Sequence, residues 1–456
     1  MEKLEFNKKK VLVVGSGISG IGAVKLLKRM GAMPVLFDEN EKTSEEEIFN
    51  KLAGEEGIEV YIGELPEKII RTVSYVVLSP GVPTDTPLCN WFKEKKIPVW
   101  GEIELGFLEE KGTLIAITGT NGKTTTTALV GEIMKDHYER AFVVGNIGKP
   151  YTVDVVRTTE STVTVAEISS FQLETIERFK PAVSAILNIT PDHLNRHHTM
   201  ENYVRIKERI ACNQTGEETC VLNYDNEYTR DFGEICPAKV VYFSSKHILK
   251  DGIFLRGEEI CMAKNGVEEQ LMNIHEMKLM GMCNVENVMA AIGISLSVGV
   301  PIASILNTVR NFKAVEHRIE FVATKKGVDY YNDSKGTNPD AAIQGIKAMT
   351  KRTVLIGGGY DKDSEYDEWI ESFDGKVKKL VLIGETRGKI AECARRHGFR
   401  DYCFADSFEE AMRICVDEAN SGDAVLLSPA CASWGMFPNY EVRGNLFKEF
   451  VNNLDD

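Results

Sequence analysis

The stretch "IAITGTNGKTTTTALV", residues 115–130, decides how the middle of the chain is expected to fold. A phosphate-binding loop reads G-x-x-x-x-G-K-[ST] and lies between a strand and a helix. Gly122, Lys123 and Thr124 supply the end of that pattern, whereas Ile117 occupies the place of the first glycine. The apolar residues on either side predict a strand at 114–117 and a helix at 126–134. This context favours a nucleotide site over a threonine-rich turn, because such a turn leaves the lysine without a role.

A loop of this kind binds phosphates through backbone N–H groups, while its lysine reaches the β and γ oxygens and the next hydroxyl binds Mg²⁺. The residues expected around the phosphates are consecutive: Gly119, Thr120, Asn121, Gly122, Lys123, Thr124 and Thr125. Ligands of parallel sheets also contact polar groups at the ends of neighbouring strands. Glu167 in "TVTVAEISSFQLE" and His193 in "NITPDHLN" hold such positions. Without the loop, the glutamate would be interpreted as a neighbour of a helix N-cap and the histidine as structural.

A second glycine motif, Gly15 to Gly20 in "VGSGISGIG", follows the first apolar strand and matches G-x-G-x-x-G. Asp38 closes the next strand, so the motif predicts a pyrophosphate at a helix N-terminus and an acid beside a ribose. NAD(P), a UDP-sugar and a plain tight turn all fit this pattern. A nicotinamide oxidoreductase would leave Lys123 and Glu167 unexplained. A nucleotide-dependent switch would leave the polar strand ends of the C-terminal part unexplained.

The order of strands and helices along the 456 residues predicts an α/β protein of two or three domains. Residues 9–40 follow a strand–helix–strand pattern, which is typical of parallel sheets. A second unit starts at the quoted loop and contains small antiparallel strands in "GIFLRGEEICMAKNGVEEQL". A third begins near residue 314, with strands such as "RTVLIGGGYDKD" and "DAVLLSPACAS". We place the domains at 1–101, 102–314 and 315–456.

Composition narrows the class of protein. The net charge of −14 argues against nucleic acid as a partner. No apolar run approaches the roughly 20 residues needed to cross a bilayer, and the N-terminus lacks a secretory pattern. Ten cysteines stand singly, as expected of reduced thiols in the cytoplasm. We expect a cytoplasmic protein without membrane insertion. No motif reports on oligomeric state, and we take a monomer as the expectation.

Six motifs together resemble the Mur ligase family: "TGTNGKTT", "EISSFQLE", "NITPDH", "EHR", "NDSKGTNPDA" and "LLSPACASW". The resemblance covers the whole chain, and "SSFQLE" and "SPACAS" favour the branch that adds D-glutamate. It implies a Rossmann-like UDP-binding domain, a central P-loop ATPase domain and a Rossmann-like C-terminal domain. It further implies an ATP-dependent ligase joining D-glutamate to UDP-N-acetylmuramoyl-L-alanine through an acyl phosphate, for peptidoglycan. The alternatives are relatives that add L-alanine or a diamino acid, or a folylpolyglutamate-synthase-like ligase.

The resemblance also assigns roles to residues. For catalysis and two magnesium sites it implies Lys123, Thr124, Glu167, His193, Arg318 and Lys207 as a carbamate. For the rest of the ATP site it implies Asn284, His317, Arg318 and Asp333. For the UDP-substrate it implies Ser19, Asp38, Gly81, Asn146 and Ser169. For D-glutamate it implies Lys335, Thr337, Lys362, Ser433 and Tyr440.

For Lys207, the local sequence and the resemblance to the Mur ligases predict different environments. On composition alone, a lysine in "YVRIKERI" is interpreted as a solvated cation on an exposed helix. A cation is also a poor neighbour for Mg²⁺. The resemblance implies instead a neutral amine that captures CO₂ and becomes an anionic carbamate with hard oxygen donors.

Overall fold

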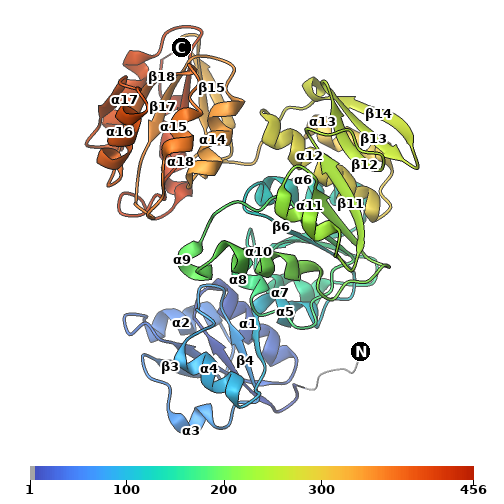
Figure 1. The fold of residues 1–456 in the computed structure, drawn as a ribbon. Coiled ribbons are helices and arrows are strands. Elements are labelled where there is room, and N and C mark those ends of the chain that lie inside the picture. Colours follow the sequence, from blue (N-terminus) through green and yellow to red (C-terminus); the bar gives the residue numbers. More distant parts are fainter. Residues whose placement is uncertain (1–5, 456) are drawn as a thin grey trace. The chain divides into compact units, whose positions relative to one another are not determined.

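The computed structural model describes residues 6–455, which pack into two compact units (Figure 1). The first comprises residues up to Arg256 together with Ile260–Leu271 and Met289–Thr308. The second comprises Gly257–Glu259, Met272–Val288 and the residues from Val309 onward. Three separate, mostly parallel sheets with flanking helices confirm the predicted α/β class and its three-domain organisation. The boundaries at residues 101 and 314 stay predictions.

The N-terminal sheet has the order β3-β2-β1-β4-β5, and all of its strands are parallel. Its strands are β1 Lys10–Val14, β2 Met33–Asp38, β3 Glu59–Ile62, β4 Tyr75–Leu78 and β5 Val99–Gly101. The helices between and after them are α1 Ile18–Arg29, α2 Glu45–Leu52, α3 Glu67–Ile70, α4 Pro87–Glu94 and α5 Glu102–Phe107. Buried apolar residues fill β1 because helices cover both faces of such a sheet.

The central sheet has nine strands in the order β14-β13-β12-β11-β10-β9-β6-β8-β7. Six of them are β6 Thr113–Thr118, β7 Ala141–Gly145, β8 Val163–Glu167, β9 Val183–Ile186, β10 Thr219–Asn223 and β11 Lys239–Ser244. The others are β12 Gly252–Arg256, β13 Glu259–Lys264 and β14 Val267–Asn273. Two-residue turns join these last three, which is the connection of antiparallel hairpins. The predicted small antiparallel strands therefore extend one edge of the parallel sheet.

Eight helices accompany the central strands within residues 6–455. They are α6 Lys123–His137, α7 Tyr151–Asp154, α8 Ser170–Leu173, α9 Leu194–His197, α10 Met200–Glu208, α11 Glu227–Gly233, α12 Met282–Ser297 and α13 Ile302–Asn311. Three 3₁₀ turns lie at Val155–Arg157, Arg209–Ala211 and Ile274–Glu276. Helix α6 begins three residues before the predicted start at 126, directly at the lysine of the phosphate loop. Within residues 6–455, no helix is both long and apolar enough to span a membrane.

The C-terminal sheet has the order β15-β16-β20-β17-β18-β19 and is parallel except for β15. Its strands are β15 Glu320–Lys325, β16 Val328–Asn332, β17 Thr353–Gly357, β18 Val377–Leu382, β19 Tyr402–Phe404 and β20 Ala424–Leu427. The helices are α14 Pro339–Ala348, α15 Asp367–Glu371, α16 Arg387–Arg396, α17 Phe408–Glu418 and α18 Tyr440–Asn452. Leu355 joins one buried cluster and its neighbours Val354 and Ile356 the other. This alternation shows that helices cover both faces.

Helix α5 fastens the N-terminal sheet to the central one through two buried acids. Glu104 accepts hydrogen bonds from the backbone N–H groups of residues 177, 178 and 179 at 2.9, 2.7 and 3.0 Å. Glu102 accepts from the backbone N–H and the hydroxyl of Thr152 at 2.7 and 2.8 Å. Burial raises the pKa of both carboxyl groups, and these hydrogen bonds oppose that rise. The first two sheets therefore share one compact unit.

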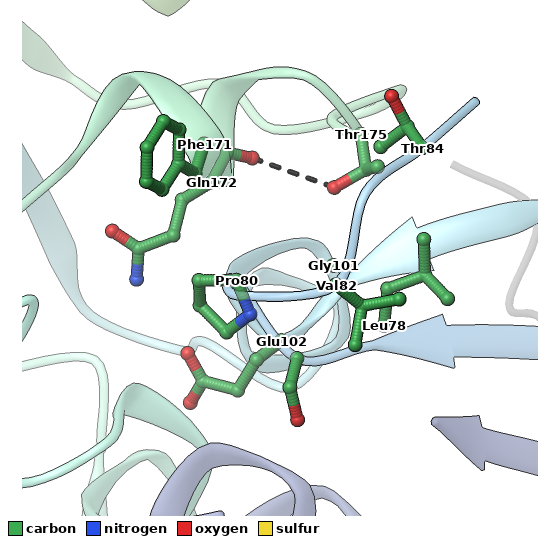
Figure 2. A pocket seen from close by; sticks show the side chains of 10 residues that line it. Leu78, Pro80, Val82, Thr84, Gly101, Glu102, Phe171, Gln172 and Thr175 are labelled. Atoms are coloured by element: carbon green, nitrogen blue, oxygen red, sulfur yellow. Dashed lines mark hydrogen bonds between the residues drawn. The ribbon is translucent and has the colours of Figure 1, made fainter. Parts of the chain in front are cut away.

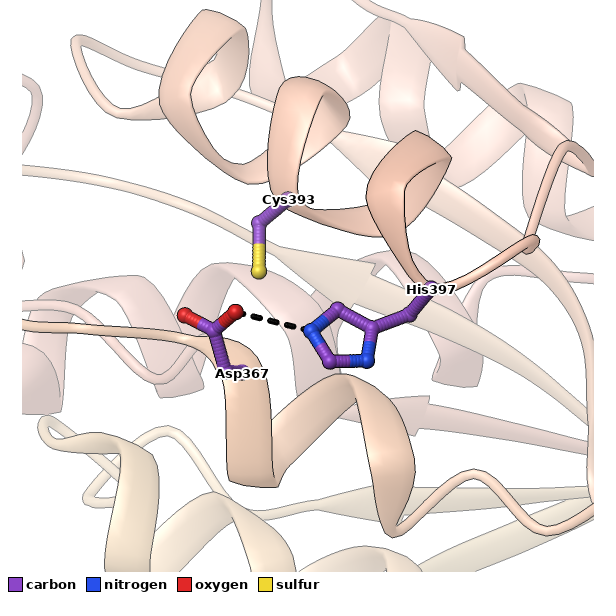
Figure 3. A group of neighbouring side chains, drawn as sticks. All are labelled: Asp367, Cys393 and His397. Carbon is purple, nitrogen blue, oxygen red and sulfur yellow. Dashed lines mark hydrogen bonds and ion pairs between the residues drawn. The ribbon is translucent and has the colours of Figure 1, made fainter.

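In the C-terminal part, Asp367, Cys393 and His397 form a side-chain cluster between α15 and the end of α16 (Figure 3). His397 Nε2 lies 2.7 Å from the Asp367 carboxylate, and Arg396 donates to the same group at 3.2 Å. Those hydrogen bonds lower the pKa of Asp367 to about 2. Burial raises the pKa of the Cys393 thiol to about 11. We interpret the cluster as a clamp between two helices, because the acid already has two nitrogen partners, His397 and Arg396, and the thiol stays protonated.

The glycine turn after β1 leads to a stability prediction. A Cβ on Gly20 would lie 1.8 Å from the backbone oxygen of Gly15, whereas a Cβ on Gly17 would meet nothing within 4 Å. We expect Gly20→Ala to lower the free energy of unfolding by about 1–3 kcal/mol, since α1 must move off the strand. Gly17→Ala is the matched control, and we expect it to stay within about 0.5 kcal/mol of wild type. Urea denaturation measures both, and equal stabilities would contradict the close packing of helix on strand.

Candidate active site

Hydrogen bonds within the protein fix the conformation of the phosphate loop. The backbone N–H of Asn121 donates to Asn188 Oδ1 at 2.8 Å, and Asn188 Nδ2 donates back to the Asn121 carbonyl at 3.2 Å. The Thr120 hydroxyl donates to the Thr190 carbonyl at 3.1 Å. Gly122, at φ 83°, turns the chain into α6 in the left-handed region that favours glycine. The segment after β9 therefore fixes the loop that follows β6.

Two lysines meet at one carbonyl of this loop. Lys123 Nζ and Lys207 Nζ each donate to the Gly119 carbonyl oxygen at 2.8 Å. Lys207 comes from α10 and is only 1% exposed. Burial and the neighbouring Lys123 cation hold the pKa of Lys207 well below its ordinary value, although Asp192 and Glu167 oppose this. The interpretation of Lys207 as a solvated helix cation is therefore wrong.

Glu167 lies beside the loop at the end of a buried strand. Strand pairing places it opposite Ile117, one residue before β6 ends. Its Oε1 accepts a hydrogen bond from Asn146 Nδ2 at 2.7 Å. Its Oε2 is buried and has no hydrogen-bond partner within residues 6–455. A buried carboxylate oxygen without a donor is costly unless a cation faces it.

The donor set around the loop suits a magnesium ion. Mg²⁺ prefers hard oxygen ligands, and the Thr124 hydroxyl and the Glu167 carboxylate supply them. His193 follows β9, which pairs with β6 on the side opposite to β8. It has φ 53° and begins helix α9. Glu167, Thr124 and His193 thus belong to the segments that follow or end the adjacent strands β8, β6 and β9.

Three of the residues predicted for the UDP-substrate, Ser19, Asp38 and Gly81, lie at the carboxyl edge of the N-terminal sheet. Asp38 Oδ2 accepts from the Ser16 backbone N–H at 2.8 Å and from its hydroxyl, and Oδ1 accepts from the Asn40 N–H at 3.0 Å. Burial would raise the pKa of Asp38, but these hydrogen bonds outweigh it and the pKa is lowered. Ser19 is half-buried in the first turn of α1, and Gly81 is exposed in the loop after β4. Asp38 therefore supports the glycine loop directly.

A pocket connects this edge to the central sheet (Figure 2). Its walls are the loop after β4, the start of α5 and helix α8, with Pro80, Glu102 and Gln172 among the lining residues. Ser169 begins α8 through a capping box with Gln172. Of the two remaining residues predicted for the UDP-substrate, Ser169 follows β8, the neighbour of β6, and Asn146 follows β7, the edge strand beyond β8.

The nucleotide residues predicted in the C-terminal part gather around Asp333. This carboxyl follows β16, is 4% exposed and accepts from the Ser428 hydroxyl at 2.7 Å. Burial raises its pKa to about 7, against the pull of Ser428 and Arg318. Arg318 Nε is buried and has no hydrogen-bond partner in the described part of the chain. His317 has φ 66° and lies 2.9 Å from the side-chain nitrogen of Asn332.

Asn284, the other predicted nucleotide residue, lies on α12. Its side-chain nitrogen donates to the Met280 carbonyl at 2.8 Å, and its oxygen accepts from Asn287 at 3.0 Å. The neighbouring Cys283 thiol has its pKa raised to about 12, by burial first and then by the charge of Asp333. Asn284 thus lies in the neighbourhood of Asp333 within the second unit.

Three loops at the carboxyl edge of the C-terminal sheet present the residues predicted for D-glutamate. Register pairs Asn332 with Leu427 and Ile356 with Leu427, so the loops after β16, β20 and β17 are neighbours. Lys335 Nζ lies 5.1 Å from the centre of the Tyr440 ring, and Lys362 Nζ lies 5.6 Å from that of Trp434. Thr337 is half-buried beside Lys335, and Ser433 is buried in the loop after β20.

Sequence reasoning missed the residues that hold these loops. Asn188 and Tyr203 contact the phosphate loop, the latter through its hydroxyl at 3.2 Å from Thr120. Arg443 is fully buried in α18, donates to the Ser334 carbonyl at 2.7 Å and lies 3.4 Å from the Cys431 carbonyl. A signal was present for Asn188, which stands just beyond an apolar strand. For Tyr203 and Arg443 the helical pattern gives none.

Comparison with known proteins gives matches to a single family over most of the chain. The family descriptions "Mur ligase MurD-like, N-terminal domain", "Mur ligase middle domain" and "Mur ligase, glutamate ligase domain" match residues 9–101, 117–295 and 317–431. A UDP-N-acetylmuramoylalanine–D-glutamate ligase of Lachnospira eligens is 56% identical over 99% of this chain and 100% of its own length. The chain belongs to the Mur ligase family, MurD type. The motif-based resemblance is thereby confirmed.

Other Mur ligases extend the comparison. A D-glutamate ligase of Lachnoclostridium phytofermentans is 54% identical over 99% of this chain and all of its own length. Among solved structures, the UDP-N-acetylmuramate–alanine ligase MurC of Thermotoga maritima superposes with a TM-score of 0.61 at 19% identity, covering 97% of this chain and 99% of that one. MurF of the same organism, in complex with ADP, gives 0.59 at 16% identity, with 98% and 96% covered. At these identities the structures support the Mur ligase fold alone.

The raised pKa of Asp333 leads to a pH prediction. Its folded pKa of about 7 lies above the ordinary value of 3.8, so the folded state binds the proton more tightly than the unfolded state. The contribution of Asp333 to stability is therefore fully present below pH 4 and is lost as the pH rises to 7. Relative to Asp333→Asn, we expect wild type to lose roughly 4 kcal/mol across this window.

Hydrogen exchange of the β16 and β20 amides, corrected for intrinsic rates, measures the local unfolding free energy of both proteins. Taking the difference between wild type and Asp333→Asn removes the titration of all other groups. A difference that stays flat from pH 4 to 8 would contradict the raised pKa.

Proposed function

We propose that this chain joins D-glutamate to UDP-N-acetylmuramoyl-L-alanine, coupled to the conversion of ATP to ADP and phosphate, in the synthesis of peptidoglycan precursors. The observation that carries the proposal is the 56% identity to a ligase of that name over practically the whole of both chains. Support comes from the phosphate loop, from the Glu167 oxygen that has no hydrogen-bond partner within residues 6–455, and from the buried Lys207 amine, which together suit the chemistry of such a ligase. The reaction class thus agrees with the local geometry.

The chemistry requires two anions to meet. The substrate carboxylate attacks the γ-phosphate of ATP, which gives an acyl phosphate and ADP. The amine of D-glutamate then attacks the acyl carbon, and phosphate leaves. Because the first step brings negative charges together, positioning and charge neutralisation dominate catalysis. Lys123 and Arg318 are the cations that we assign to this role, with Arg318 directed at the γ-phosphate.

We assign two magnesium sites to the edge of the central sheet. Thr124 would hold one ion, and Glu167, His193 and a carbamate on Lys207 would hold the second. When bound, the ions neutralise and orient the phosphate oxygens. The lowered pKa of Lys207 supports the carbamate, because only a neutral amine captures CO₂. The proton released on capture leaves to solvent.

The remaining residues divide among three ligands. For ATP we assign the loop from Gly119 to Thr125 together with Asn284, His317 and Asp333, the last on the ribose. For the UDP-substrate we assign Ser19, Asp38, Gly81, Asn146 and Ser169. For D-glutamate we assign Lys335, Thr337, Lys362, Ser433 and Tyr440. We place the domains at 1–101, 102–314 and 315–456, with the UDP-substrate bound by the first and second, ATP by the second and third, and D-glutamate by the third.

We place the enzyme in the cytoplasm as a monomer, where ATP and the soluble UDP-substrate are found. A net charge of −14 gives it no general attraction for nucleic acid, so its anionic ligands must be bound by local groups. The lysines and glycine loops described above supply such groups.

A panel of amino acids tests the proposed function. Phosphate release is measured with ATP, Mg²⁺ and UDP-N-acetylmuramoyl-L-alanine while the amino acid varies. We expect turnover with D-glutamate and background rates with L-alanine, L-glutamate and a diamino acid. Faster turnover with a diamino acid, or with L-alanine on UDP-N-acetylmuramate, would move the chain to another branch of the family. No turnover with any of them would overturn the ligase proposal.

Lys207 offers a test of the carbamate. We expect Lys207→Ala to lose at least about 100-fold in kcat, in line with removal of one preorganised charged group. Added formate or acetate should restore part of the activity by replacing the missing anion. Lys207→Arg should stay inactive with either additive, because its guanidinium keeps its charge and cannot form the carbamate.

Controls separate chemistry from folding. Lys207 is buried, so circular dichroism must show that both variants are folded before rates are compared. Lys135→Ala removes a half-exposed lysine from α6 and should leave kcat unchanged. Full activity in folded Lys207→Ala, or no rescue by either small carboxylate, would count against the carbamate.

A further inference from the structure

A buried ion pair outside the groups assigned above joins the N-terminal sheet to the central sheet. Arg196 donates to both oxygens of Glu174, from Nε at 3.1 Å and from a terminal nitrogen at 2.7 Å. The two side chains are only 15% and 9% exposed. The same terminal nitrogen of Arg196 donates to the backbone carbonyl of Val82 at 3.0 Å. On the other side, the Thr84 hydroxyl donates to Glu174 at 3.1 Å.

The pair therefore holds both ends of one loop. Val82 and Thr84 belong to the segment 79–84 after β4, which contains Gly81 and lines the pocket of Figure 2. Arg196 lies on α9 and Glu174 directly follows α8, and both of these helices belong to the central part of the chain. A bidentate guanidinium–carboxylate pair fixes orientation as well as distance. The loop thus has its place set by groups that it does not itself contain.

Arg196 is also coupled to the residue that we assign to magnesium. The backbone N–H of Arg196 donates to the His193 carbonyl at 2.9 Å within the single turn of α9. Its guanidinium lies over the Phe171 ring, 5.1 Å from the centre. The His193 ring packs against the same phenylalanine at 5.0 Å. One aromatic ring therefore separates the ion pair from the proposed metal ligand.

The pair lies in a site from which water is nearly excluded. His197 lies beside it, with Nδ1 3.6 Å from Glu174 Oε1. Removing either partner would leave an uncompensated charge in a nearly dry site.

We propose that Arg196 and Glu174 are positioning residues that hold the Pro80–Thr84 loop against the central sheet, so that the UDP-substrate bound by this loop presents its carboxylate to the phosphate loop. The inference rests on the proposed function for the identity of the ligand. The anchoring of the loop itself rests on the contacts alone. A bond network of purely structural value would stabilise the fold and leave substrate binding unchanged.

The test compares Arg196→Ala, Arg196→Lys and Glu174→Gln with wild type. We expect Arg196→Ala to raise the KM for the UDP-substrate about 10- to 100-fold, because a misplacement of about 1 Å has effects of this size. The KM for ATP should change less than about 3-fold, since neither residue contacts the phosphate loop. Arg196→Lys should rescue only in part, because an ammonium group cannot make the bidentate pair and the Val82 contact together.

The matched control is Arg413→Ala, which breaks an Arg–Glu pair with both side chains about two-thirds exposed on α17. We expect it to leave both KM values unchanged. The double variant Arg196→Ala/Glu174→Gln should resemble Arg196→Ala alone, because residues in one network are not additive. An unchanged KM for the UDP-substrate in folded Arg196→Ala, with only a lower Tm, would overturn the proposal.

Hydrogen exchange keeps this test apart from that of the proposed function. The Val82 amide donates to the Ser79 carbonyl at 3.0 Å, so its exchange reports on the order of the loop. We expect faster exchange of the Gly81, Val82 and Thr84 amides in Arg196→Ala than in Arg413→Ala, with no ligand present. If wild type lacks ligase activity, the proposed function fails while loop anchoring is still tested. If wild type is active and exchange is unchanged, only the positioning role fails.

Discussion

The candidate active site depends on two lysine amines that donate hydrogen bonds to the same backbone carbonyl oxygen. Lys123 and Lys207 both donate to Gly119, in a place where water is largely excluded. Two ammonium groups at such a distance repel strongly, and the buried one loses its proton more readily. In the proposed mechanism Lys123 stays a cation for phosphate and Lys207 supplies the neutral amine. One shared acceptor and a difference in burial would then account for their different roles.

Parallel sheets explain why the ligand-binding residues collect as they do. In each of the three sheets, the predicted residues follow the carboxyl ends of adjacent strands, where helices begin and backbone N–H groups point outward. The acids among them have contrasting environments. Asp38 is held ionised by three donors, Asp333 is buried with its pKa raised, and Glu167 keeps one oxygen without a donor. These differences indicate different tasks for chemically similar groups.

Much of this was predictable from the sequence, because the decisive signals are local. The loop from Gly119 to Thr125 is recognisable from its glycine and lysine spacing and from its place between an apolar strand and a helix. The turn from Gly15 to Gly20 is recognisable in the same way from its glycine spacing. Burial across the fold was not predictable: "YVRIKERI" has the pattern of a surface helix, yet α10 turns Lys207 inward onto Gly119. Contacts between distant segments were equally invisible, including Arg443 with Ser334 and Asn188 with Asn121. The sequence pattern shows on which face of a helix or strand a residue lies, but not which distant residue it contacts.

The mutual hydrogen bonds between Asn121 and Asn188 have a thermodynamic consequence for the phosphate loop. A glycine-rich segment without such ties samples many backbone conformations, and a ligand that selected one would have to offset the lost entropy. Here the ordering is completed when the chain folds, so nucleotide association begins from a rigid receptor. The conformational part of the cost of binding is then smaller than for a disordered loop. The same rigidity limits adaptation, so discrimination among nucleotides has to arise from groups that contact the base and the ribose.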